Sequence, residues 1–80
     1  MGNKQIVLSG KNLVKFLEKL GFVVVRINGS HSRMKHEDGR ITTVPVHKND
    51  DLPKGLVRKI IREDLVMSLE EFEESYKKSN

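Results

Sequence analysis

His31 has the best setting for acid–base chemistry in this sequence, because two arginines, Arg26 and Arg33, lie close to it along the chain. An imidazole can move a proton to or from an oxygen, and guanidinium groups can hold a phosphate and its developing charge. This combination suits cleavage of an RNA phosphodiester. The simpler interpretation is an exposed strand histidine in a basic patch. There is no cysteine, and covalent catalysis has no obvious candidate.

A metal site is the competing use of the three histidines, His31, His36 and His47, together with Asp50 or Asp51. No pair of these histidines has the i, i+4 spacing of a helix or the i, i+2 spacing of a strand. The sequence therefore predicts no metal site and no cofactor. The two aspartates are interpreted as helix-capping or loop residues.

Further basic residues are candidates for phosphate contacts. Lys35 follows Arg33 at strand spacing, and Lys54 lies at the start of a predicted helix, where free N–H groups can meet an anion. With Arg26 and Arg33 they form the predicted RNA-binding set. A further stripe on that helix (Arg58, Lys59 and Arg62) is interpreted as solvated surface.

The composition describes one small basic domain over residues 1–80. Residues 1–66 carry thirteen Lys and Arg against seven Asp and Glu, whereas residues 67–80 carry two against four. A basic body indicates a polyanionic partner. The absence of cysteine, of a signal-like apolar run and of a membrane-length segment predicts a cytoplasmic protein that does not bind membranes.

The apolar periodicity predicts an α+β fold. Ser9 and Gly21 mark the two ends of a first amphipathic helix, and residues 22–47 form a three-stranded antiparallel meander. A second helix follows over residues 53–65, and a capping box at Ser68 and Glu71 starts a short third helix with an apolar stripe (Leu69, Phe72 and Tyr76). The expected architecture is an αβββα two-layer sandwich with an extra C-terminal helix.

The strand register decides which side chains face the core. An Asn28-Gly29 turn would place Val25 opposite Ser32 and Arg26 opposite His31. A three-residue loop at residues 37–39 would place Met34 opposite Thr42 and Ser32 opposite Val44, with Pro45 on an edge strand. The predicted core face is then Val23, Val25, Ile27, Met34, Val44 and Val46. The predicted open face is Arg26, His31, Arg33, Lys35, Thr43 and His47.

Several short pieces, in a fixed order and spacing, resemble the HicA family of toxins. They are Leu20-Gly21-Phe22, Gly29-Ser30-His31, His36 to Arg40, Val44-Pro45-Val46-His47, and Leu52 to Gly55 ahead of Arg58-Lys59-Ile60. The resemblance implies a double-stranded-RNA-binding-domain-like fold. It also implies a type II toxin that cleaves mRNA as a metal-independent endoribonuclease, with His31 as the catalytic residue. Many members carry a second histidine where this chain has Ser32.

The same resemblance implies a HicB-type antitoxin as partner, which masks the active surface. Whether the toxin–antitoxin complex contains an oligomer is left open. Two other functions remain open at this point. One is a non-catalytic RNA-binding module, since only one residue is a good catalyst. The other is a pure protein-interaction domain that docks through its acidic last helix.

Overall fold

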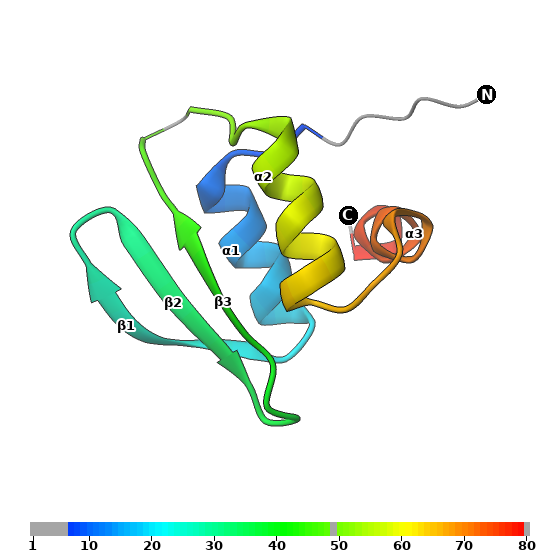
Figure 1. Ribbon diagram of the computed structural model, residues 1–80, viewed down its shortest axis with the longest axis horizontal. Coiled ribbons are helices and arrows are strands. Elements are labelled where there is room, and N and C mark those ends of the chain that lie inside the picture. Colours follow the sequence, from blue (N-terminus) through cyan, green and yellow to red (C-terminus); the bar gives the residue numbers. More distant parts are fainter. Residues whose placement is uncertain (1–6, 49, 80) are drawn as a thin grey trace.

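The computed structural model describes residues 7–48 and 50–79 and confirms the predicted α+β architecture (Figure 1). The elements are α1 (Gly10–Lys19), β1 (Phe22–Asn28), β2 (His31–His36), β3 (Ile41–Pro45), α2 (Lys54–Lys59), the π-helical turn η1 (Ile60–Asp64) and α3 (Leu69–Ser79). The strands form one antiparallel sheet in the order β1-β2-β3, so β1 and β3 are its edges.

The first helix begins and ends where its sequence predicts. The Ser9 hydroxyl accepts a hydrogen bond from the backbone N–H of Asn12 at 3.1 Å, which satisfies one of the free N–H groups at the helix start. Gly21 follows the C-cap with a φ of +105°, a conformation that glycine adopts without a steric penalty. The helix ends at Lys19, and Leu20 and Gly21 connect it to β1.

The predicted pairing of β2 with β3 is confirmed. Ser32 pairs with Val44, and Met34 pairs with Thr42. The backbone N–H of His36 donates to the carbonyl of Arg40 at 2.9 Å, so residues 37–39 form the predicted three-residue loop, and Gly39 within it has a φ of +102°. Pro45 ends the edge strand β3, where a residue that lacks an N–H donor is tolerated.

The turn between β1 and β2 was predicted one residue too early, so the predicted pairing was wrong by two residues next to the turn and by one residue from Val24 back to Phe22. Asn28 pairs with His31, so the central turn residues are Gly29 and Ser30 rather than Asn28 and Gly29. Of these two turn residues, Gly29 alone has a positive φ (+63°), as in a type II′ turn, which needs glycine at its first central position. Arg26 consequently pairs with Arg33, and a bulge interrupts the ladder between Val24 and Arg26.

In the first half of β1, this difference in register exchanges the residues that face the core with those that face the open side. Phe22 is buried and Val24 is partly buried against the core, whereas Val23 is 58% exposed and Val25 is 52% exposed. The prediction that Val23, Val25 and Ile27 belong to the core was therefore wrong; Ile27 is 69% exposed. The bulge reverses the alternation again. As a result Arg26 still lies on the open face, as predicted.

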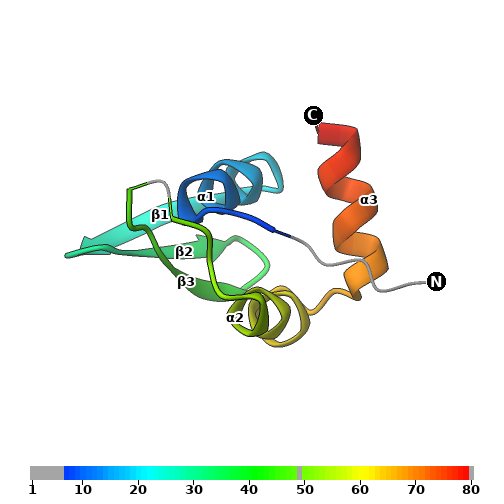
Figure 2. The same cartoon turned by 90° about the horizontal axis from the view of Figure 1, so that it is seen from above.

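The rest of the predicted core face is confirmed. Met34 and Val44 are fully buried, and Val46 is partly buried against the core. Helix α1 packs against the sheet, and α2 with η1 lies beside β3, as Figure 2 shows from above. The core is formed by these elements and α3 (Leu8, Leu13, Phe16, Leu17, Phe22, Met34, Val44, Leu52, Val57, Ile60, Ile61, Leu65 and Phe72).

The predicted third helix is present, and its apolar stripe packs on this core. Phe72 is fully buried, and its ring meets the ring of Phe16 edge-on at a centroid distance of 5.0 Å. Tyr76 meets the same ring edge-on at 5.2 Å. The capping box is also present: the N–H of Glu71 donates to the Ser68 hydroxyl, and the N–H of Ser68 donates to the Glu71 carboxylate.

The second helix differs from its predicted form at both ends. Pro53 is its N-cap and no side chain caps the helix, so the loop interpretation of Asp50 and Asp51 is correct and the capping interpretation was wrong. At the other end the helix widens into η1, where the N–H of Leu65 donates to the carbonyl of Ile60 at 2.9 Å. Here the Thr42 hydroxyl of β3 donates to the Asp64 carboxylate at 2.8 Å.

Candidate active site

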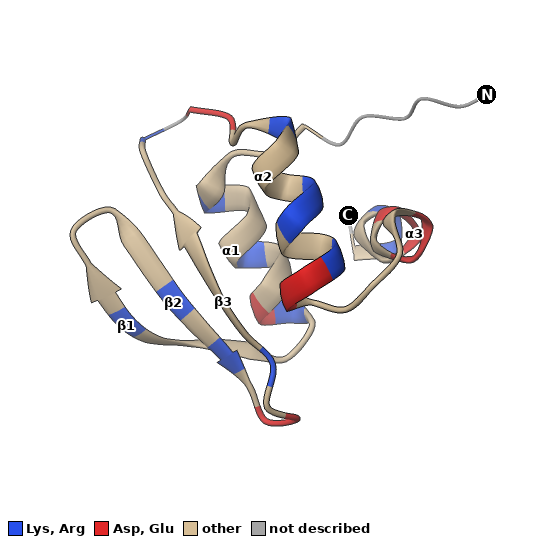
Figure 3. Cartoon of the chain, viewed as in Figure 1, with Lys and Arg blue, Asp and Glu red and all other residues tan. Residues whose placement is uncertain are grey.

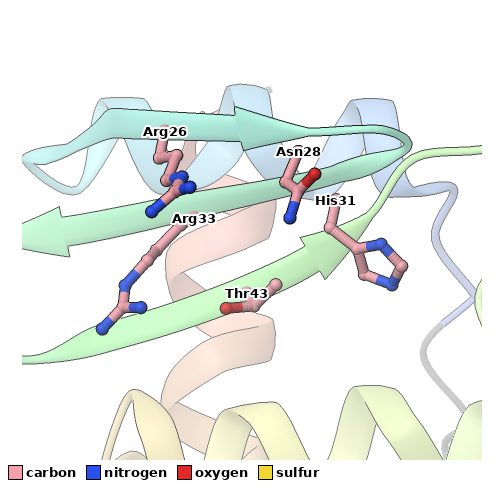
Figure 4. A pocket seen from close by; sticks show the side chains of 5 residues that line it. All are labelled: Arg26, Asn28, His31, Arg33 and Thr43. Carbon is pink, nitrogen blue, oxygen red and sulfur yellow. The ribbon is translucent and has the colours of Figure 1, made fainter.

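Five side chains on the open face of the sheet surround a shallow pocket of about 340 Å³ (Figure 4). They come from all three strands: Arg26 and Asn28 from β1, His31 and Arg33 from β2, and Thr43 from β3. Strand pairing places them together, because Asn28 pairs with His31 and Arg33 lies between Arg26 and Thr43. The lining includes two guanidinium groups and no carboxylate.

His31 is exposed at the edge of this pocket, next to the β1–β2 turn. Within the part of the chain that the structure describes, no hydrogen bond or ion pair engages its imidazole. Both ring nitrogens are therefore available to a ligand. The sheet holds the backbone of His31 opposite Pro45 on one side and Asn28 on the other.

The structure brings together three of the five predicted site residues. Arg26, Arg33 and His31 line the pocket, whereas Lys35 lies on the same exposed face, farther along β2, paired with Val23. Lys54 begins α2 and does not line the pocket. The exposed position predicted for Thr43 is confirmed, and it lies in the pocket.

Two further residues were missed in the sequence. Asn28 was assigned to the turn, and only the register shift shows that it lies in a strand beside His31. Lys59 was interpreted as solvated surface. It lines a groove of about 380 Å³ between β3 and α2, which shares Arg33 and Thr43 with the pocket. Arg33 and Thr43 therefore connect the pocket with this groove, whose other charged residues are Lys59 and Asp64.

The other two histidines have different surroundings. His36 lies at the opposite end of β2, with Nε2 3.1 Å from the carbonyl oxygen of Leu20 and Nδ1 3.1 Å from the backbone N of Asp38. Its ring also meets Phe22 edge-on at 5.0 Å, so it has a structural role. His47 follows β3, and its Nε2 is 3.4 Å from the Ser30 hydroxyl. The described residues contain no cluster of three or more potential metal ligands.

Charge is distributed unevenly over the molecule (Figure 3). The charged residues of β1 and β2 are all basic, and those of α1 and α2 are mostly basic, whereas acidic residues lie in the β2–β3 turn, in the loop before α2, at the end of η1 and along α3. In that turn the backbone N–H of Arg40, and then its guanidinium, hold the pKa of Asp38 below its usual value. Arg40 also donates to the carbonyl of Leu65 at 2.7 Å and lies over the ring of Phe22. Arg40 is thus a structural cation, unlike the arginines of the pocket.

The fold and the site together define a small αβββα domain with an exposed histidine beside two arginines of the sheet. The family model described as HicA toxin of bacterial toxin–antitoxin systems matches residues 10–64, which is more than half of the chain. The chain therefore belongs to the HicA toxin family. No curated protein matches it significantly.

The matched segment contains every residue of the pocket and ends before α3. Membership of a toxin–antitoxin family assigns the chain the role of a toxin that is paired with an antitoxin. Among the described residues, no helix is both long enough and apolar enough to cross a membrane.

Proposed function

We propose that this HicA-family toxin is an endoribonuclease that cleaves mRNA, with His31 as its catalytic histidine. One observation carries the proposal: His31 is exposed and unengaged among the described residues, at the edge of a pocket that also presents Arg26 and Arg33. The pocket lies open on a sheet face, so an extended polymer can reach it. A small substrate would instead need an enclosed cavity.

The pocket residues have complementary tasks in this reaction. The guanidinium groups of Arg26 and Arg33 bind the phosphate and stabilise the negative charge that grows on its oxygens in the transition state. The imidazole of His31 moves a proton at a reacting oxygen, which contributes about 10²–10⁴-fold to the rate. The Asn28 amide and the Thr43 hydroxyl can hydrogen-bond the neighbouring sugar.

The chemistry needs a ribose. The 2′-hydroxyl loses its proton and its oxygen attacks phosphorus, while the bond from phosphorus to the 5′-oxygen breaks and that oxygen gains a proton. The products are a 2′,3′-cyclic phosphate and a free 5′-hydroxyl. No metal ion takes part in these steps. DNA lacks the nucleophile and should bind the same basic face without being cut.

The antitoxin of this family is proposed to be a HicB-type protein that covers the open face. Val23 and Val25 are both more than half exposed there, beside Arg26 and Lys35. A partner with an apolar centre and acidic side chains would bury these valines and neutralise the basic residues. Such a partner would also close the pocket, which explains how binding prevents cleavage.

The first test is cleavage of a defined RNA by the purified protein in EDTA, with His31→Ala and His31→Gln as variants. We expect both variants to lose cleavage, while their unfolding temperatures and their affinities for RNA stay close to those of the original protein. The ends of the products should be a cyclic phosphate and a 5′-hydroxyl. Cleavage that survives in both variants would refute the role of His31.

A matched pair of arginine variants tests the pocket. Arg33→Ala removes a guanidinium from the pocket, whereas Arg58→Ala removes an equally exposed one from α2 that does not line it. Each variant loses one positive charge, but only Arg33 is placed to contact the phosphate in the pocket, so Arg58→Ala should weaken RNA binding less. Only Arg33→Ala should also lower kcat, because only its charge lies at the reacting phosphate.

A non-catalytic RNA-binding module is the second candidate. It is favoured by the lining of the pocket, in which His31 is the one group suited to proton transfer at neutral pH. In that case the protein would bind RNA with the salt dependence typical of phosphate contacts, and the RNA would stay intact. Intact RNA in the presence of folded, RNA-bound protein would favour this function over the nuclease.

A further inference from the structure

A second histidine lies at the same end of the sheet as His31. His47 follows β3, and its Nε2 is 3.4 Å from the hydroxyl of Ser30, the residue directly before His31. The backbone N–H of Val46 donates to the carbonyl of Ser30 at 2.6 Å, so the pairing of the two strands continues beyond the end of β3. His47 is exposed, as is His31.

The backbone register places His31 and His47 on the same face of the sheet. His31 pairs with Pro45, and His47 lies two residues beyond Pro45. Side chains alternate along an extended strand, so His47 shares the side of Pro45, which is the open side. Residues in this diagonal relation have Cβ atoms about 7–8 Å apart, a span that long polar side chains and one phosphodiester can bridge.

The segment that carries His47 is held in place. The backbone N–H of Asp50 donates to the carbonyl of His47 at 2.9 Å. On the other side, the end of β3 packs so closely on the start of α1 that a methyl group added at Gly10 would overlap the carbonyl oxygen of Pro45. His47 is therefore a fixed part of the site, with Lys48 as the adjacent charged side chain.

The cleavage proposed above requires two proton transfers at two different oxygens. The attacking 2′-oxygen and the leaving 5′-oxygen lie on opposite sides of phosphorus in an in-line displacement. One imidazole cannot be within hydrogen-bond distance of both oxygens when they are so placed. His31 lines the pocket, where Asn28 and Thr43 can hold the attacking ribose. The leaving oxygen then lies outside the pocket. His47 also lies outside the pocket, on the side of His31 that is away from Arg26 and Arg33.

We propose that His47 is the second proton-transfer residue of this toxin: it gives a proton to the leaving 5′-oxygen while His31 takes the proton of the 2′-hydroxyl. The proposal rests on the nuclease function proposed above. The attacking oxygen forms its bond to phosphorus as the 5′-oxygen leaves with the bonding electron pair. The two histidines end with their protonation states exchanged, and solvent restores them.

The test uses two substrates that differ only in the leaving atom. After the cleaved linkage in a short RNA has been mapped, the bridging 5′-oxygen at that linkage is replaced by sulfur, which leaves without being protonated. We expect His47→Ala and His47→Gln to cleave the oxygen substrate about 10²–10⁴-fold more slowly than the original protein. On the sulfur substrate, both variants should cleave at a rate within about tenfold of the rate of the original protein. His31→Ala should be inactive on both substrates.

A purely structural role for His47 gives a different result. Loss of its contact with Ser30 would then slow the oxygen and sulfur substrates equally, and this outcome would overturn the proposal. So would full activity of His47→Ala on the oxygen substrate. In either case an inactive His31→Ala would leave the nuclease function standing, whereas no cleavage by the original protein would remove the nuclease function itself.

Discussion

Phe72→Ala should destabilise the protein severely although Phe72 lies outside the segment that matches the family. Its side chain is fully buried and its ring packs edge-on against Phe16. Truncating a buried phenylalanine costs about 3–5 kcal/mol through lost apolar burial and the cavity left behind. A chain of this size has a total stability of about 4–12 kcal/mol, so the loss is a large part of the whole.

Urea unfolding followed by circular dichroism measures this effect. We expect the midpoint of Phe72→Ala to fall by about 1–5 M, since small proteins lose about 1–3 kcal/mol of stability per molar urea. Phe72→Leu keeps an apolar side chain and should lose less, about 1–2 kcal/mol. Glu74→Ala, an exposed change on the same helix, should stay within about 0.5 kcal/mol of the original protein.

Activity provides the second measurement for the same variants. Helix α3 contributes no side chain to the pocket, so the folded fraction of Phe72→Leu should cleave RNA at the original rate. A loss of less than about 1 kcal/mol in Phe72→Ala would show that α3 is not docked through this ring. The proposed packing of α3 on the core would then be wrong, whereas the proposals on the pocket would not be affected.

Two other perturbations test the remainder of the fold. Gly10→Ala should lower stability by about 1–3 kcal/mol in the same urea assay, because its methyl group would overlap the carbonyl oxygen of Pro45; a rise in stability would contradict this close approach. Asp38→Asn should lower the unfolding temperature at pH 7 but not at low pH. The backbone N–H and then the guanidinium of Arg40 depress the pKa of Asp38 in the folded state, so the stabilisation is complete well above 3.8, the ordinary value, and is lost as pH falls through the lowered pKa. A difference in unfolding temperature that persists in strong acid would show that the ionised carboxylate of Asp38 is not the source of this stabilisation.

The sequence could predict the β2–β3 hairpin but not the β1–β2 hairpin, for a physical reason. Polar and apolar residues alternate along β2, and Gly39 fixes the loop, so only one register gives a buried face. In β1 the run Phe22 to Val25 is apolar throughout, so either alternation looks equally good. The bulge at Val25 then conceals the error, because Arg26 reaches the open face in both registers.

The predicted site was incomplete because its geometry depends on contacts between distant segments. The apolar spacing of residues 56–65 fits an ordinary α-helix, and nothing in it signals the π-helical turn. That turn accompanies the hydrogen bonds from Thr42 to Asp64 and from Arg40 to Leu65, which link β3 and the β2–β3 turn to the end of η1. Lys59 lines the groove beside Arg33 because of this packing, so its place could not be read from the spacing of charges on one helix.

The two ends of the sheet serve different purposes, which explains why similar residues have different roles in this small fold. At one end His36 and Arg40 are engaged by backbone carbonyls and by the ring of Phe22, so they hold the β2–β3 turn against the core. At the other end His31 has no such partner among the described residues and lies beside two arginines. A thin core leaves few residues to position a site. A strand pair held by the turn at Gly29 and by the close contact of α1 with β3 therefore supplies the rigidity that acid–base catalysis requires.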